Sequence, residues 1–113
     1  MIYQSDTISV EYTKPGIARF TFAAAGSVNK FDQQTLTDCK AALDKLHADS
    51  NLKGVIFTSS KDTFIVGADI TEFLSTFQRP EAELVPWIKQ ASDIFDLCED
   101  LPVPTVAAIK GFA

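Results

Sequence analysis

The chain has 113 residues, which is enough for one domain of ordinary size and too few for two. Hydrophobic residues make up 46% of it and charged residues 22%, close to the globular average, which argues against a disordered chain or a coiled coil. Fifteen acidic side chains against ten basic ones give a formal net charge of -5, so a cationic surface that binds nucleic acid is not expected.

Several other kinds of protein are also disfavoured. The apolar runs are too short to cross a bilayer and residues 1–5 do not begin a signal peptide, so no transmembrane segment is expected. Cys39 and Cys98 are far apart in the sequence and are interpreted as reduced packing residues, which favours a cytoplasmic location. His47 is the only histidine and is interpreted as a surface residue, so neither a metal centre nor a histidine-based triad is expected.

An antiparallel hairpin is predicted near the N-terminus. Apolar and polar residues alternate over residues 8–12 and again over 17–22, which is typical of strands with one buried face. The turn sequence Lys-Pro-Gly at residues 14–16 separates the two runs. The buried face of the second strand is expected to hold Ala18, Phe20 and Phe22.

A helix is predicted next, capped by Asp32 and running to about residue 48. Its apolar face is expected to carry Leu36, Cys39, Ala42, Leu43 and Leu46. Its polar face is expected to carry Asp38, Lys40, Asp44 and Lys45.

The remaining elements alternate between strands and helices. Consecutive apolar residues predict buried strands over 53–59, 64–66 and 104–109. A short helix is predicted over 70–77, with an apolar side made of Ile70, Phe73, Leu74 and Phe77. A longer helix from residue 80 is expected to bury Leu84, Ile88, Ala91, Phe95 and Cys98, with Pro86 in or near its first turn. Strands separated by helices predict an α/β fold with a parallel sheet.

The junction at residues 64–69 is the segment that points to chemistry. Gly67 has no Cβ, so a ligand can approach the main chain closely, and Asp69 can cap the helix that follows. The N–H of Ala68 would then be free to donate to an anionic atom, as in an oxyanion hole. The alternative is that this turn only connects two elements. Phe31, Phe73 and Phe77 are either lining residues of an apolar tunnel or ordinary core.

Three segments resemble the crotonase superfamily of enoyl-CoA hydratases and isomerases. They are Gly-Ser-Val-Asn-Lys-Phe-Asp at residues 26–32, Phe-Ile-Val-Gly-Ala-Asp-Ile-Thr-Glu-Phe at 64–73, and the strand and Lys-Gly-Phe-Ala at 101–113. The first two are especially similar to the N-terminal region of the alpha subunits of bacterial fatty acid oxidation complexes. The resemblance covers essentially the whole chain, in order.

The resemblance implies an α/β fold, the N-terminal part of a crotonase-like ββα spiral over residues 1–113. It implies a protein of fatty acid beta-oxidation that hydrates trans-2-enoyl-CoA to 3-hydroxyacyl-CoA, with double-bond isomerisation as a second activity. Ala68 would be the first of two backbone donors to the thioester oxygen. The other substrate-binding positions would be Val28, Asn29, Lys30, Phe64, Val66, Gly67, Asp69, Ile70 and Phe73.

This sequence departs from the family pattern in two places. Thr71 stands where many relatives have a lysine that pairs with a CoA phosphate, so that contact would come from Lys30, Lys61 or a further segment. No acid in the chain matches the two catalytic glutamates of the family. The chain is therefore expected to be a piece of a longer protein, cut after a strand, and to be inactive alone because hydration needs an acid and a base.

The resemblance implies no cofactor other than the CoA of the substrate, with NAD only if a dehydrogenase domain follows. It favours a homo-oligomer, and a whole protein in complex with a thiolase subunit. An uncovered sheet edge would also let copies of this chain pair. The alternative function is a non-catalytic α/β binding or assembly module.

Overall fold

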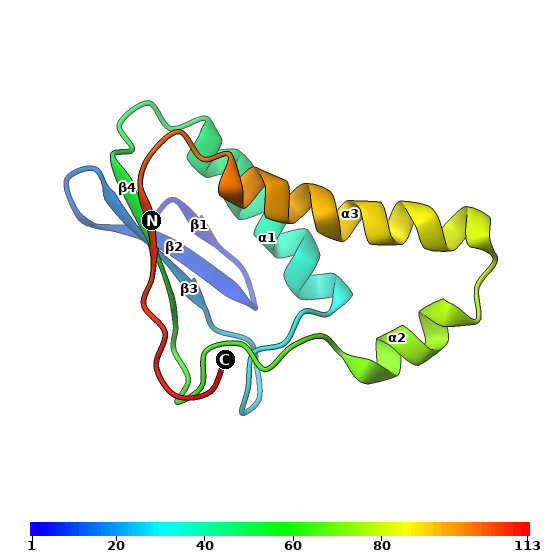
Figure 1. Ribbon diagram of the computed structural model, residues 1–113. Coiled ribbons are helices and arrows are strands. Elements are labelled where there is room, and N and C mark those ends of the chain that lie inside the picture. Colours follow the sequence, from blue (N-terminus) through cyan, green and yellow to red (C-terminus); the bar gives the residue numbers. More distant parts are fainter.

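The computed structural model describes all 113 residues and contains a five-stranded sheet with its helices gathered on one side (Figure 1). The strands are β1 (Tyr3–Gln4), β2 (Ile8–Lys14), β3 (Ile17–Phe22), β4 (Gly54–Ser59) and β5 (Thr105–Ala107). The helices are α1 (Gln33–His47), α2 (Ile70–Phe77) and α3 (Glu81–Glu99). The strands neighbour one another in chain order, antiparallel from β1 to β3 and parallel from β3 to β5. The predicted α/β fold with parallel strands is confirmed.

The predicted hairpin is confirmed in β2 and β3. Gly16 in its turn has φ 83, a backbone conformation that residues with a Cβ rarely adopt. The inward face of β3 is buried as expected. The sequence does not predict β1, because two residues are too few to show an alternating pattern.

Helix α1 has the predicted bounds and apolar face, and Asp32 caps it by accepting from the N–H of Thr35 at 2.8 Å. The placement of Asp38 on its polar face is wrong. This carboxylate is buried and accepts hydrogen bonds from the hydroxyls of Thr7 (2.6 Å) and Tyr3 (3.3 Å). Burial raises the pKa of the Asp38 carboxyl and the hydrogen bonds lower it by more, so the pKa lies below its ordinary value. The N-terminal strands cover this side of the helix.

The predicted apolar stripe of α3 is only partly correct. Ile94, which lies outside the stripe, is the one buried residue of the helix, whereas Ile88 and Phe95 are each 48% exposed. Figure 1 shows the reason. The C-terminal half of α3 packs against α1, whereas the N-terminal half of α3 extends past the sheet together with α2. Pro86 is the sixth residue of α3 and lies just after the first turn, close to the expected place. It leaves the carbonyl of Ala82 without a helical donor, and Ala82 is exposed.

Two predicted strands also differ. Residues 64–66 form no strand, because they build no ladder with a single neighbour: the N–H of Phe64 donates to the carbonyl of Phe112, and that of Val66 to the carbonyl of Asn29. Residues 104–109 are not a buried strand: β5 is only three residues long, and all three are exposed at the edge of the sheet. Accordingly, the two-sided burial expected for β4 is incomplete, since Ile56 is only partly covered.

The core lies between the sheet and α1, with contributions from α3. Cys39 is part of it and Cys98 packs against it, and both are free thiols, as predicted. His47 is exposed at the end of α1, with its Nε2 2.7 Å from the carbonyl oxygen of Leu97. None of the three helices combines the length and the apolar character needed to cross a membrane.

Candidate functional site

The site forms where residues 29–31 lie beside residues 66–69. The N–H of Phe31 donates to the carbonyl of Gly67 at 2.8 Å, and Phe31 and Ala68 form a parallel bridge. The peptide that joins Gly67 to Ala68 is trans, so its carbonyl and its N–H point in opposite directions. The N–H of Ala68 therefore points away from Phe31, and it makes no hydrogen bond within the chain.

Gly67 makes this arrangement possible. The N–H of Val66 donates to the carbonyl of Asn29 at 2.9 Å, and the N–H of Asp69 donates to that of Phe31 at 3.1 Å. In a regular extended chain, N–H groups three residues apart point to opposite sides, but these two point to the same segment. Gly67 has φ 121, which permits the reversal. A Cβ built at Gly67 would meet nothing within 4 Å, so the backbone conformation, and not crowding, requires glycine.

Ala68 lines an apolar cavity of about 360 Å³, which we call the outer cavity. Nine of its ten lining residues are hydrophobic: Phe31, Leu36, Ala68, Phe73, Phe77, Trp87, Ile88, Ala91 and Phe95, with Ser92 as the tenth. The rings of Phe73 and Phe77 are stacked at 5.5 Å, and Trp87 meets Phe73 edge-on at the same distance. The structure thus brings the aromatic residues singled out in the sequence to the same hollow as Ala68, whose N–H is unpaired.

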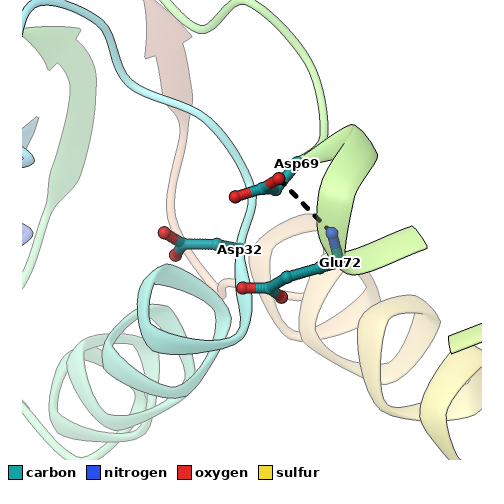
Figure 2. Close-up of side chains that lie close together, drawn as sticks. All are labelled: Asp32, Asp69 and Glu72. Carbon is teal, nitrogen blue, oxygen red and sulfur yellow. Dashed lines mark hydrogen bonds between the residues drawn. The ribbon is translucent and has the colours of Figure 1, made fainter. Parts of the chain in front are cut away.

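Three carboxylates gather where the N-termini of α1 and α2 meet (Figure 2). One carboxylate oxygen from each of Asp32, Asp69 and Glu72 lies within 4.8 Å of the other two. Each has a partner in the chain: Asp32 caps α1, Asp69 caps α2, and Glu72 accepts from the backbone N–H of Gln33 at 2.9 Å. Lys30 adds a positive charge, with its Nζ 3.0 Å from Asp69. Helix capping and this ion pair account for the cluster without a metal ion.

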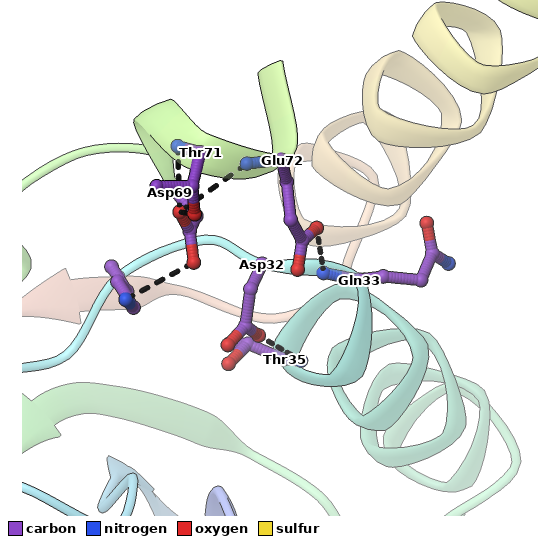
Figure 3. Close-up of polar contacts among 7 residues, drawn as sticks. Asp32, Gln33, Thr35, Asp69, Thr71 and Glu72 are labelled. Carbon is purple, nitrogen blue, oxygen red and sulfur yellow. Dashed lines mark hydrogen bonds and ion pairs between the residues drawn. The ribbon is translucent and has the colours of Figure 1, made fainter. Parts of the chain in front are cut away.

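Glu72 joins the two helices, because its carboxylate on α2 accepts from the backbone N–H of Gln33 at the start of α1 (Figure 3). A glutamate three residues after a helix cap commonly reaches back to the N–H of the capping residue. Here the N–H of Asp69 already donates to Phe31, so Glu72 takes the N–H of Gln33 on α1 instead. The Asp-Ile-Thr-Glu spacing is the sequence signal for a glutamate in this role, but it does not identify the partner.

The charge on Asp69 is strongly stabilised. Its carboxylate accepts hydrogen bonds from the hydroxyl and the N–H of Thr71 and pairs with Lys30 (Figure 3). The Thr71 hydroxyl first, and then Lys30, lower the pKa of Asp69 to about 2. The same contact with Asp69 raises the pKa of Lys30. Thr71 therefore serves the cap of α2.

Asn29 is buried, and its side chain is used within the fold. Its Nδ2 lies 2.8 Å from Ser59 Oγ, 3.0 Å from the carbonyl oxygen of Phe64 and 3.1 Å from that of Phe22. Its Oδ1 accepts from the N–H of Ala24 at 3.0 Å. Asn29 therefore connects the loop before α1, the end of β4 and the segment that leads to Ala68, and its side chain has no atom left for a ligand.

The other predicted substrate-binding residues differ in exposure. Val66, Gly67 and Ile70 are exposed, whereas Val28, Lys30, Phe64 and Phe73 are partly buried. Phe73 lines the outer cavity and Phe64 does not. Lys61 lies near the loop before α1, because its Nζ donates to the carbonyl of Gly26 at 2.8 Å.

A larger hollow of about 600 Å³ lies beside the turn between β2 and β3. One of its seven lining residues is hydrophobic: they are Tyr12, Thr13, Lys14, Pro15, Gly16, Asn51 and Lys53. None of the predicted site residues lines it, so the outer cavity, with its unpaired backbone donor, is the better candidate site. The chemistry available there is the binding of a carbonyl oxygen whose neighbouring groups are apolar.

Comparisons with known proteins agree with this interpretation. The model of the enoyl-CoA hydratase/isomerase family matches residues 12–113. An enoyl-CoA hydratase/isomerase from Xanthobacter autotrophicus is 28% identical, with a TM-score of 0.83, over 96% of this chain and 40% of its own. An enoyl-CoA hydratase/carnithine racemase from Magnetospirillum magneticum is 23% identical, with a TM-score of 0.86, over 97% and 41%. An enoyl-CoA hydratase from Bacillus anthracis is 24% identical, with a TM-score of 0.78, over 93% and 40%. The chain thus spans about two fifths of the length of these structures.

Proposed function

This chain belongs to the enoyl-CoA hydratase/isomerase family, and from that premise we propose that residues 1–113 are the N-terminal portion of a domain that hydrates trans-2-enoyl-CoA to 3-hydroxyacyl-CoA. Isomerisation of the double bond is the second activity that the family permits. The whole protein would act in fatty acid beta-oxidation, and the residues around Asn29 and Asp69 favour one similar to the alpha subunits of bacterial fatty acid oxidation complexes.

The observation that carries this proposal is the unpaired N–H of Ala68, a residue that lines the outer cavity. When a nucleophile adds to the double bond, or a proton leaves the carbon beside the carbonyl, negative charge develops on the thioester oxygen. A fixed N–H donor aimed at that oxygen stabilises the charge without reorganising, and one such donor is worth about 3 to 4 kcal/mol in other enzymes. The bridge between Phe31 and Ala68 supplies the fixed orientation.

The proton transfers of hydration need an acid and a base close to the substrate. The only polar side chain that lines the outer cavity is that of Ser92, and no carboxylate lines it. The clustered carboxylates of Asp32, Asp69 and Glu72 belong to residues adjacent in the chain to lining residues, but each is engaged by N–H groups at the start of α1 or α2. These 113 residues are therefore expected to bind a thioester and not to turn it over.

The CoA portion would lie along the loop before α1 and the segment before Ala68. Val28, Asn29 and Lys30 would contact it from one side, Phe64, Val66 and Gly67 from the other, and Asp69 and Ile70 would complete the binding set. For Asn29 and Gly67 only backbone atoms are available. Lys30 and Lys61 are the cations near this loop and would approach the phosphates.

The wider setting is also part of the proposal. The whole protein would be a cytoplasmic homo-oligomer that binds a thiolase subunit and would use NAD only with an additional dehydrogenase domain. The exposed edge at β5 supports pairing between copies of this chain.

Amide NMR of the chain tests the role of Ala68. Crotonyl-CoA should shift the Ala68 amide proton downfield, whereas the thioether analogue of the same length, which has no carbonyl oxygen, should not. The amide of exposed Asn51 should respond to neither. Equal shifts of the Ala68 amide with both compounds, or none with either, would contradict the proposal and favour a non-catalytic module. Turnover of crotonyl-CoA above background would contradict the expected inactivity.

A further inference from the structure

A second apolar hollow of about 300 Å³ adjoins the outer cavity, and we call it the inner cavity. All ten of its lining residues are hydrophobic: Phe22, Phe31, Cys39, Phe57, Phe64, Ile65, Ile94, Phe95, Cys98 and Ala107. They come from β3, β4, α1, α3, β5, the loop before α1 and the segment before Gly67. An unbranched hydrocarbon is the kind of ligand that such a lining accepts, because it offers no polar partner.

Only Phe31 and Phe95 line both cavities. Their rings meet edge-to-face, with centroids 5.2 Å apart and planes at 90°. Phe31 is held from behind by Phe22, whose ring it meets at 85° and 6.0 Å. The pair is therefore a wall of two side chains between the cavities, and α3, which carries Phe95, forms its half-exposed side.

We propose that the Phe31–Phe95 pair sets the longest acyl chain that this site accepts, and that Phe95 is the residue that determines this specificity. The inference rests on the proposed function, because the Ala68 N–H holds the carbonyl end of the chain at the outer cavity. A tail that extends from there along the aromatic lining gains roughly fourfold in affinity for each methylene that it buries. The affinity stops rising when the terminal methyl of the tail reaches the Phe31–Phe95 pair, unless the outer cavity is connected to the inner one.

The direct test is a series of straight-chain acyl-CoA thioesters from butanoyl to dodecanoyl, titrated below their micelle concentrations. Trp87 is the only tryptophan and lines the outer cavity, so its fluorescence reports binding, and calorimetry gives the affinity independently. In the unmodified chain the affinity should rise with length to a break and then stay constant. In Phe95→Ala the two cavities join, and the break should move to longer chains by several methylenes.

The matched control is Phe77→Ala. Phe77 is also an aromatic residue of the outer cavity, but it is 61% exposed and does not line the inner cavity. Its removal should leave the break at the same chain length. If the break instead moves by the same amount in both variants, the loss of any aromatic surface explains the shift, and a wall at Phe95 is contradicted.

Cys98 provides a second measurement, because it lines the inner cavity and not the outer one. Dodecanoyl-CoA should slow the alkylation of Cys98 at least several-fold in Phe95→Ala and leave it unchanged in the parent chain. If Phe95→Ala does not fold, as judged by circular dichroism, Phe95→Leu keeps the helix packed while removing the ring edge, and should give a smaller shift in the same direction.

The outcomes separate this inference from the proposed function. If no thioester binds, both are overturned. If thioesters bind and Ala68 responds, but the break is the same in the parent chain and in the folded Phe95 variant, the inference is wrong and the proposed function stands. The same conclusion follows if the longest chain does not protect Cys98 in that variant.

Discussion

Replacement of Asn29 by alanine should destabilise the fold far more than loss of one polar side chain usually does. Asn29 is 2% exposed and connects the loop before α1, the end of β4 and the segment that leads to Ala68. Its side chain holds the loop before α1 against the end of β4, and it holds the carbonyl of Phe64 close to both. The substitution therefore removes the anchor of the backbone that presents Ala68.

The magnitude follows from counting donors and acceptors. The Nδ2 group of Asn29 carries two hydrogens and faces three acceptors, while Oδ1 accepts one N–H, so about three hydrogen bonds form at once. At about 1 kcal/mol net for each, and with a buried group left unsatisfied, the free energy of unfolding should fall by about 3 to 5 kcal/mol. This is a large part of the roughly 5 to 15 kcal/mol that stabilises a typical domain.

A second substitution at the same position sharpens the reasoning. Asn29→Asp keeps the shape but directs an oxygen at the carbonyl oxygens of Phe22 and Phe64, so at neutral pH it should destabilise more than Asn29→Ala. Burial raises the pKa of the introduced carboxyl above its value in the unfolded chain. Between these two pKa values the folded state therefore binds more protons than the unfolded state. The loss in free energy of unfolding relative to the parent chain should therefore shrink as the pH falls, because the protonated carboxyl supplies one hydrogen-bond donor.

Urea denaturation followed by circular dichroism measures these differences. With an ordinary dependence on urea, Asn29→Ala should lower the midpoint by roughly 2 M. Asn51→Ala is the control, because Asn51 is exposed and its side chain makes no hydrogen bond, and it should change stability by less than about 0.5 kcal/mol. A loss under 1 kcal/mol for Asn29→Ala would refute the assigned role, as would equal stabilities of the two Asn29 variants at neutral pH.

Three further predictions follow from the site. The pKa of Asp69 is lowered to about 2, so its stabilising contribution is complete above the ordinary carboxyl pKa and is lost as the pH falls toward 2. Across that pH range the melting temperature should therefore fall less in Asp69→Asn than in the parent chain. Identical dependence of the melting temperature on pH in the two proteins would contradict the stabilising role assigned to Asp69. Gly67→Ala should cost about 1 to 3 kcal/mol in backbone strain and should abolish the downfield shift of the Ala68 amide with crotonyl-CoA, and unchanged spectra would argue against the orientation assigned to that N–H. Burial raises the pKa of the Cys39 thiol to about 12, so mass spectrometry after alkylation of the native chain should find Cys98 modified well before Cys39, and the reverse order would show that α1 does not cover Cys39 as described.

Local patterns in the sequence carry most of the first half of the fold. Alternation predicts the hairpin, and the Asp32 cap with helical spacing predicts α1, because each depends on residues within a turn or two of one another. The same holds for the cap of α2 at Asp69. The resemblance to crotonases added the family and the proposed role of Ala68, both of which rest on short ordered motifs.

The second half is less predictable because its surroundings, and not its own pattern, determine burial. The apolar stripe of α3 is regular, but only the part that crosses α1 is covered, so Ile94 is buried while Ile88 is half exposed. The apolar run at 104–109 likewise indicates a covered strand, yet β5 lies at the edge of the sheet. Hydrophobic composition states what a segment can bury, and not what packs against it.

The sequence by itself determined the hairpin, the three helices, the glycine at position 67 and the aspartate that caps the next helix. The tertiary structure alone decided that the N–H of Ala68 is unpaired, since this depends on Phe31, which lies 37 positions earlier in the chain, taking the carbonyl on the other side of the same peptide. It also decided that Glu72 joins α2 to α1. Such contacts form between segments that approach only when the sheet and helices have packed, and neither segment carries a local signal for its partner.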